Sequence, residues 1–185
     1  MTPAIALFER AFYFLRHGET ESNARGIIGG SLDVELTAAG RVQAMQAARA
    51  LATRTISDVY SSPLRRAFDT AVPIGEALGL PVTVIDELAE RNWGVLEGQP
   101  RSIRVRGVTP EGAETFQAFL ERVLCGLGRV HGDAPLIVAH SGVFRVLCRT
   151  LDIVETEAPV TNALPIHFVP LAAGWRIEPV QGCPL

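Results

Sequence analysis

The sequence lacks the features that mark several special classes of protein. It has only three cysteines among 185 residues, an odd number without CxxC spacing, so neither a disulfide framework nor a zinc site is expected. The thiols of Cys125, Cys148 and Cys183 are predicted to be buried and reduced. No apolar run approaches the ~20 residues that span a bilayer, and no basic segment precedes the apolar patch near the N-terminus. We therefore expect a cytoplasmic protein with no membrane partner.

The sequence also lacks a strong excess of charge of either sign. Its net charge of −3 gives no global attraction to nucleic acid, so we expect no nucleic-acid partner, and any anion-binding site must be local. Hydrophobic residues make up 48% and charged residues 20%, as in ordinary globular proteins. Without an internal repeat or linker, the chain is predicted to form one domain over residues 1–185. The sequence makes no prediction of an oligomeric state.

Segments typical of strands alternate with segments typical of helices. Strands are predicted at 11–15, 57–62, 81–86 and 134–141, helices at 36–54, 63–79, 114–130 and 143–151, and a closing β-hairpin at 163–180. Repeated βα units predict an α/β fold with a mostly parallel central sheet and helices on both faces. Residues 91–113, rich in Gly and Pro, break this pattern and are predicted to form a loop or a small insertion.

Local signals place the ends of the first two predicted helices. Thr37 suits the N-cap of the first helix, Pro63 the first turn of the second, and Gly79 the end of the second. The apolar face of the first helix is predicted from positions near helical period, namely Val42, Met45, Ala48 and Leu51.

Polar residues gather at the carboxyl ends of the predicted strands. They are Arg16 and His17 after the first strand, Ser61 and Ser62 after the second, Glu87 and Glu90 after the third, and His140 and Ser141 after the fourth. In open α/β sheets, ligands bind at these strand ends, where helix N-termini also point. The helix after the second strand adds Arg65 and Arg66 in its opening turn. Together these groups predict an anion pocket, and phosphate is its natural guest because guanidinium forks match phosphate oxygens.

Five segments resemble, in order, the motifs of the histidine phosphatase superfamily, the phosphoglycerate mutase-like proteins. They are "LRHGETESN" (15–23), "SSPLRRAFDTA" (61–71), "ELAERNWGVLEG" (87–98), "PEGAETFQAFLERV" (110–123) and "IVAHSGVFRVL" (137–147). One RHG motif would be a weak signal, but the ordered set is specific. The resemblance implies a three-layer α/β/α sandwich in which residues 91–113 form a reduced cap insertion.

The resemblance also implies roles for five residues. His17 is the nucleophile, Arg16 and Arg66 bind the phosphoryl oxygens, His140 completes the pocket, and Glu90 donates a proton. A neutral imidazole would attack phosphorus, the arginines and a protonated His140 would stabilise charge on the equatorial oxygens, and water would cleave the phosphohistidine. No metal or other cofactor is expected, because these groups already supply positive charge.

The resemblance also assigns residues to substrate binding, and the sequence departs from the family pattern at two positions. Thr20 and Asn23 match positions that line the substrate in relatives, and Ser141 is assigned to substrate binding, although relatives often have glycine there. Ile27 stands where relatives often carry an arginine. Glu87 is the local competitor of Glu90 for the acid role. The departures from the family pattern at Ser141 and Ile27 leave substrate recognition open but remove no catalytic group.

Arg101, Arg104 and Arg106 lie in the predicted cap and allow two interpretations. They form either a solvated turn or a basic lip that contacts a second anionic group of the substrate.

Three functions fit the motifs. The first is a metal-independent phosphomonoester hydrolase whose partner is a small phosphorylated substrate, of the α-ribazole phosphate type among others, or a phosphoprotein. The second is a phosphoglycerate mutase-type transferase, in which the phosphorylated enzyme returns the group to a second hydroxyl. The third is a non-catalytic phospholigand-binding module, which the presence of His17 and Glu90 disfavours. The short cap favours the hydrolase, since water reaches the intermediate more easily.

Overall fold

The computed structural model describes residues 5–154 and 160–180, which contain a six-stranded sheet in the order β3-β2-β4-β1-β5-β6. The strands are β1 (Phe12–Arg16), β2 (Val59–Ser61), β3 (Val82–Val84), β4 (Leu136–Ala139), β5 (Pro165–Pro170) and β6 (Trp175–Pro179). The first four are parallel, and β5 and β6 form an antiparallel hairpin beside β1. The predicted mostly parallel sheet and closing hairpin are confirmed.

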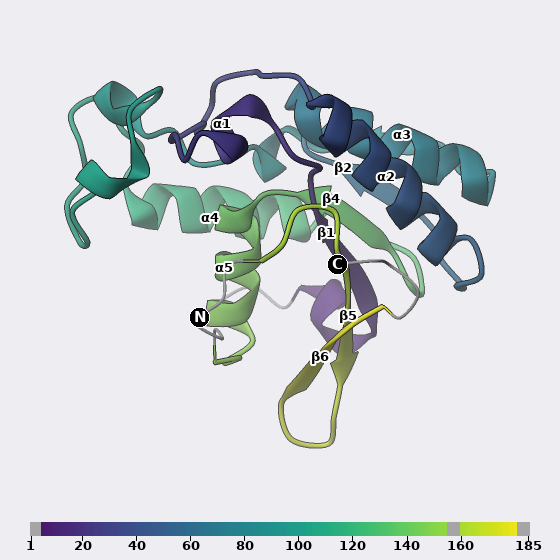
Figure 1. Ribbon diagram of the computed structural model, residues 1–185. Helices are drawn as coiled ribbons and strands as arrows, with labels where there is room; N and C mark the ends of the chain where they lie inside the picture. The colour runs from purple at the N-terminus through teal and green to yellow at the C-terminus, as the bar shows by residue number, and fades with distance from the viewer. Residues whose placement is uncertain (1–4, 155–159, 181–185) are drawn as a thin grey trace.

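Helices cover both faces of the sheet (Figure 1). They are α1 (Glu21–Ala24), α2 (Ala38–Leu51), α3 (Arg65–Leu78), α4 (Phe116–Leu127) and α5 (Ser141–Thr150), with 3-10 turns at Ala6–Glu9, Asp86–Leu88, Gly94–Leu96 and Arg101–Ile103. Helices α2 and α3 pack on one face, and α4 and α5 pack on the other. The result is the expected three-layer α/β/α sandwich.

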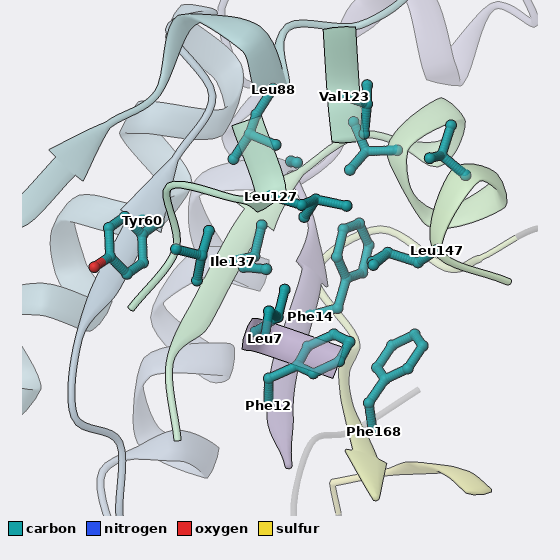
Figure 2. Packing of buried hydrophobic residues seen from close by; sticks show 14 of the residues in the cluster. Leu7, Phe12, Phe14, Tyr60, Leu88, Val123, Leu127, Ile137, Leu147 and Phe168 are labelled. Atoms are coloured by element: carbon teal, nitrogen blue, oxygen red, sulfur yellow. The ribbon is translucent and has the colours of Figure 1, made fainter. Parts of the chain in front are cut away.

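The central strand β1 is buried on both faces. Phe12 and Phe14 point into the cluster under α4 and α5, whereas Tyr13 and Leu15 point into the cluster under α2 and α3. Figure 2 shows the first cluster, in which Phe12 stacks on Phe168 of β5 with ring centroids 4.5 Å apart. This double burial holds the carboxyl end of β1 in a fixed position for the groups that follow it.

Local signals predicted most helix ends. The Thr37 hydroxyl caps α2 by accepting a hydrogen bond from a backbone N–H of the first turn, and Gly79 ends α3 at φ 67°. The prediction for Pro63 was wrong, because α3 begins at Arg65 with Leu64 as its N-cap. Pro63 therefore precedes the helix and does not lie in its first turn.

The predicted apolar face of α2 is partly wrong. Ala48 and Leu51 are buried, but Val42 and Met45 are 57% and 50% exposed. The helix packs against α3 and the sheet through small residues, Gly40, Ala44, Ala47 and Ala48. Close approach between helices favours small side chains, so the larger apolar residues lie on the outer side.

Two glycines allow α2 to approach the loop after β1. A Cβ atom on Gly18 would collide with the carbonyl of Gly40, and a Cβ on Gly40 would collide with the backbone of Glu19. The backbone N–H of Thr37 also donates to the Glu19 carbonyl at 2.9 Å. The loop that carries His17 is therefore pressed directly against the N-terminus of α2.

Residues 91–113, the cap, contain two 3-10 turns and no α-helix. The cap projects beside α1, as the teal segment of Figure 1 shows. It pairs with the loop after α1: the Ile28 N–H donates to Gln99 and the Gly98 N–H donates to Ile28, each at 2.9 Å. The cap is thus tied to the loop that follows the RHG motif.

Burial of the cysteines differs from the prediction at one position. Cys148 is buried, whereas Cys125 is exposed because it faces away from the side of α4 that packs on the sheet. Cys183 lies outside the described residues. Over residues 5–154 and 160–180, none of the helices is long and apolar enough to cross a membrane.

Candidate active site

Strand register brings three predicted strand-end residues together. In the sheet, Arg16 is paired with Ala139 and Ser61 with Val138, so His17, Ser62 and His140 follow at the same edge. The imidazole centroids of His17 and His140 are 5.2 Å apart. The sheet therefore brings residues of three motifs that are distant in the sequence together in one site.

His17 is held in a single tautomer by its own loop. Its Nδ1 lies 2.7 Å from the Gly18 carbonyl, which can only accept a hydrogen bond, so Nδ1 carries the proton. Nε2 is left with its lone pair and accepts from Arg66 Nε at 3.2 Å. Burial, followed by Arg66 and Arg16, lowers the pKa of His17 well below 6.5. The ring is therefore neutral at neutral pH and presents a nucleophilic nitrogen.

Arg66 is fixed by the loop that precedes α2. Its two terminal nitrogens donate to the Leu32 carbonyl at 2.7 Å and the Gly30 carbonyl at 2.8 Å, while Nε points at His17. Arg65 instead pairs with Glu35 at 2.7 Å on the surface. Of the two adjacent arginines, the structure brings Arg66 to the site.

Arg16 and His140 each have a buried polar atom without a partner among the described residues. Arg16 donates from one terminal nitrogen to the Val160 carbonyl at 2.7 Å, and its Nε has no acceptor. Nε2 of His140 lies 2.7 Å from the Ser62 hydroxyl, and its Nδ1 has no partner. Leaving such groups unpaired costs about 1–3 kcal/mol each, so a phosphoryl oxygen beside them would be stabilised.

The charge states of these two residues differ. Burial and neighbouring charges, Arg101 foremost, lower the pKa of Arg16 to about 10, which leaves it cationic at neutral pH. Burial, followed by Arg66 and His17, lowers the pKa of His140 well below 6.5. This direction favours the neutral ring in this structure, whereas the expected protonation of His140 concerns the ring beside a phosphoryl group and stays a prediction. A bound phosphoryl dianion would oppose that shift.

Glu90 lies at the N-terminus of α5. Its carboxylate accepts from the Gly142 N–H at 3.0 Å and from the Ser141 hydroxyl at 3.4 Å. A Cβ atom on Gly142 would collide with this carboxylate and with the ring of Phe119. Glu87 forms an ion pair with Arg129 at 2.7 Å and does not line the pocket.

Thr20 and Asn23 form a reciprocal capping box at the start of α1. The Asn23 side-chain oxygen accepts from the Thr20 N–H at 3.1 Å, and the Thr20 hydroxyl accepts from the Asn23 N–H at 3.3 Å. Both residues line the pocket, as does Ser141. All eight residues predicted for the site therefore lie in or beside one cavity.

Three further residues hold the site together: Ser62, which the sequence placed at the strand ends without a role, and Thr70 and Asn162, which it did not assign to the site. Ser62 bonds His140, and Thr70 accepts from the Gly18 N–H at 2.9 Å. The Asn162 amide donates to the His17 carbonyl at 2.8 Å and to Asn23 at 3.0 Å. The sequence could have indicated Thr70, because it lies four residues after Arg66 and so on the same face of α3. Nothing in the sequence indicated Asn162.

The cavity has a volume of about 210 Å³ and is strongly cationic. The arginines that line it are Arg16, Arg66, Arg91, Arg101, Arg104 and Arg145, and Glu90 is the single carboxylate among the lining residues described. Within the described part of the chain, no group of three or more His, Cys, Asp or Glu side chains is placed to hold a metal ion. The donor set of the cavity thus suits an anion.

Known proteins match this arrangement. The model of the Histidine phosphatase superfamily (branch 1) matches residues 12–167. The uncharacterized phosphatase PhoE of Bacillus subtilis is 33% identical over 179 residues, which cover 91% of this chain and 92% of that protein. Agropine synthesis reductase of Rhizobium rhizogenes is 32% identical over 177 residues, but the chain spans only 41% of its length.

Solved structures agree with the sequence matches. The mycobacterial glucosyl-3-phosphoglycerate phosphatase in complex with VO3 superposes with a TM-score of 0.77 at 28% identity, covering 92% of this chain and 98% of that one. An Escherichia coli protein provisionally named an alpha-ribazole-5'-P phosphatase gives a TM-score of 0.78 at 26% identity, covering 92% and 95%.

Proposed function

Because the chain belongs to the histidine phosphatase superfamily and is a phosphatase, we propose that it hydrolyses phosphomonoesters of small metabolites through a phosphohistidine, without a metal. One observation carries this proposal: the Gly18 carbonyl holds the Nδ1 proton of His17 in a hydrogen bond of 2.7 Å, which leaves Nε2 unprotonated beside a cavity lined by arginines. The Nε2 lone pair accepts from Arg66 Nε at 3.2 Å, and attack requires Arg66 to pass this hydrogen bond to a phosphoryl oxygen. That geometry suits in-line attack on phosphorus better than it suits simple binding of phosphate.

In the first step, the Nε2 lone pair forms a bond to phosphorus and the bond to the leaving oxygen breaks. Glu90, in its acid form, gives its proton to that oxygen. Arg16, Arg66 and Nδ1 of His140 face the charge on the phosphoryl oxygens, where fixed donors stabilise the transition state. The Gly18 carbonyl stabilises the positive charge that develops on the ring, since it accepts a hydrogen bond from Nδ1–H at 2.7 Å.

In the second step, water attacks phosphorus and the bond to Nε2 breaks, returning the electron pair to His17. Glu90, now a carboxylate, accepts the proton from water. The residues are thereby restored, and phosphate is released. Positive charge comes from the arginines, so no step requires a metal.

The size of the cavity supports a small substrate. Its volume of about 210 Å³ suits a phosphorylated metabolite better than a folded phosphoprotein. Both solved relatives described above are named for small phosphorylated metabolites, and the α-ribazole phosphate type remains one candidate class.

Transfer to a second hydroxyl, as in a phosphoglycerate mutase, is the alternative. The cap has no α-helix, and most of residues 98–109 are exposed. Such a cap admits water to the intermediate, which favours hydrolysis over retention and transfer.

The test is to trap the intermediate. We expect rapid quenching into alkali with ³²P-labelled substrate to leave label on His17, and the activity to survive EDTA followed by dialysis. With 3-phosphoglycerate present, phosphate should pass to water faster than 2-phosphoglycerate forms.

The variant His17→Ala should carry no label. Label that persists in this variant would overturn the assignment of the nucleophile. Activity lost in EDTA and restored by Mg²⁺, Mn²⁺ or Zn²⁺ would overturn the metal-independent mechanism.

A further inference from the structure

Among the described residues, two arginines of the cap line the cavity without forming an ion pair. Arg65, Arg122 and Arg129 each form an ion pair of 2.7–2.8 Å with a carboxylate. Arg101 and Arg104 line the cavity, and neither has an ion pair with any Asp or Glu side chain in the described residues. The cavity therefore holds cationic groups whose charge the described chain does not neutralise.

Arg104 is held in place by stacking. Its guanidinium carbon lies 4.2 Å from the centroid of the Trp93 ring, and that of Arg91 lies 4.4 Å from the same ring. Stacking leaves the N–H edges of a guanidinium available to an anion in its plane. The backbone N–H of Trp93 donates to the Glu97 carboxylate at 3.0 Å, which ties the backbone that carries this ring to the cap.

Arg101 is fixed from the other side of the cavity. Its Nε donates to the Ile27 carbonyl at 3.2 Å, and its backbone N–H donates to Gly26 at 2.9 Å. The backbone of the loop after α1 thus positions an arginine of the cap.

The cap arginines share one cavity with the cations of the phosphoryl site. Arg101 and Arg104 line it together with Arg16, Arg66 and His17. In keeping with this proximity, Arg101 contributes to lowering the pKa of Arg16 and of His17, and the pKa of Arg104 is lowered first by burial and then by Arg145, Arg91 and Arg101. An anion bound among these cations would relieve their mutual repulsion.

We propose that the substrate carries a second anionic group, a carboxylate or a second phosphate, which Arg101 and Arg104 bind at the cap while Trp93 holds Arg104 in position. This inference rests on the phosphatase function proposed above and specifies its substrate class. Arg106, two residues further along the cap, is exposed and does not line the cavity, so it has no part in this subsite.

Matched substrates test the subsite. 3-Phosphoglycerate and glycerol 3-phosphate differ by a carboxylate in place of a hydroxymethyl group. Fructose 1,6-bisphosphate and fructose 6-phosphate differ by a second phosphate. We expect kcat/KM to be roughly 10- to 100-fold higher for the doubly anionic member of at least one pair, as for a hydrogen bond to a charged group. The preferred pair then identifies the second group as carboxylate or phosphate.

Variants assign the preference to residues. Arg104→Gln and Arg101→Gln should each reduce the ratio of kcat/KM within the preferred pair by about 10-fold or more. Trp93→Leu should reduce it less, with the loss mainly in KM. Arg106→Gln, the matched control in the same segment, should leave the ratio unchanged.

Two outcomes overturn the inference. One is hydrolysis of p-nitrophenyl phosphate with no preference within either pair, which would contradict the subsite but not the phosphatase. The other is an equal loss of the ratio in Arg104→Gln and Arg106→Gln, which would mean that only diffuse charge attracts the substrate. Failure to hydrolyse any phosphomonoester, including p-nitrophenyl phosphate, would instead contradict the proposed function itself.

Discussion

The strand-end pocket and the cap lie on the same cavity but are built differently. In the pocket, His17, Arg66 and His140 are buried, and each is held by a carbonyl or hydroxyl of a neighbouring segment. In the cap, Arg104 belongs to an exposed segment and is positioned by stacking on Trp93. The pocket residues are therefore fixed by several elements of the fold, whereas Arg104 depends on one neighbouring side chain of the cap. We infer that the pocket determines the reaction and the cap determines the substrate.

The largest expected effect tests the proton donor of the pocket by comparing two leaving groups. Glu90→Gln should slow phosphoryl transfer from an alkyl phosphate by about 10²–10⁴-fold, because an alkoxide needs a proton to depart. It should slow p-nitrophenyl phosphate far less, since p-nitrophenolate leaves without one. The measurement is a single-turnover rate of transfer to His17, which excludes the common dephosphorylation step.

Glu87→Gln is the matched control for this effect. Glu87 pairs with Arg129 away from the cavity, so its variant should show no dependence on leaving group. Equal losses for both substrates in Glu90→Gln would show that Glu90 orients another group and is not the acid.

The second largest effect concerns the Arg66 guanidinium, which links the pocket to the loop before α2. Arg66→Lys keeps the charge, but an ammonium group cannot reach the Gly30 and Leu32 carbonyls and His17 at once. We expect kcat/KM to fall by about 10²–10³-fold for all phosphomonoesters alike, since a fixed donor to the transition state is lost. Arg65→Lys, next to it on the surface, should change kcat/KM less than threefold, and a similar loss there would contradict the assignment to Arg66.

The residues of the pocket could be predicted from the sequence because strand ends and register determine their position. His17, Ser62 and His140 each lie at the carboxyl end of a predicted strand, and the carboxyl ends of parallel strands meet at one edge of the sheet. The tautomer of His17 could not be predicted, since it depends on a hydrogen bond to the Gly18 carbonyl. Nor could Asn162, which reaches His17 from 145 residues away.

The cap and the outer helix faces were harder to predict for a different reason. Composition indicated a loop at 91–113, but only the fold shows that Arg104 stacks on Trp93 while Arg106 does not line the cavity. Hydrophobicity favoured Val42 and Met45 as the buried side of α2, whereas close packing selected alanines. Non-local contacts determine both outcomes, and no local pattern encodes them.

A smaller effect tests whether the helix α5 N-terminus positions the acid. In Gly142→Ala, the new Cβ would collide with the Glu90 carboxylate and Phe119, so the carboxylate must move. We expect alkyl phosphate turnover to fall by roughly 10- to 100-fold, less than in Glu90→Gln, because the group is displaced but kept. Gly128→Ala, at the end of α4, would bring the new Cβ to 3.3 Å from the Cys125 carbonyl and to neither Glu90 nor Phe119, so alkyl phosphate turnover should change little. An unchanged rate in Gly142→Ala would show that the contact with α5 is not needed.

The smallest effect concerns stability and pH. His17 and His140 are buried, and their pKa values in the folded protein lie well below 6.5, whereas in the unfolded chain they titrate near 6.5. Below that pH the unfolded chain binds protons that the folded pocket rejects, so the free energy of unfolding decreases as the pH falls. Each histidine contributes a slope of up to about 1.4 kcal/mol per pH unit, from pH 6.5 down to its folded pKa.

Urea unfolding between pH 5.0 and 6.5 in phosphate-free buffer measures this slope. His140→Asn should reduce the slope by up to about 1.4 kcal/mol per pH unit, and His17→Asn provides the same test if the first variant does not fold. His167, whose pKa is also lowered by burial, keeps some slope in both variants. Val42→Thr, an exposed and non-titrating change, should leave the slope as it is. A slope unchanged in both histidine variants would mean that the folded pocket takes up protons as readily as the unfolded chain does. The buried pocket would then not differ from the exposed cap in its effect on titrating groups.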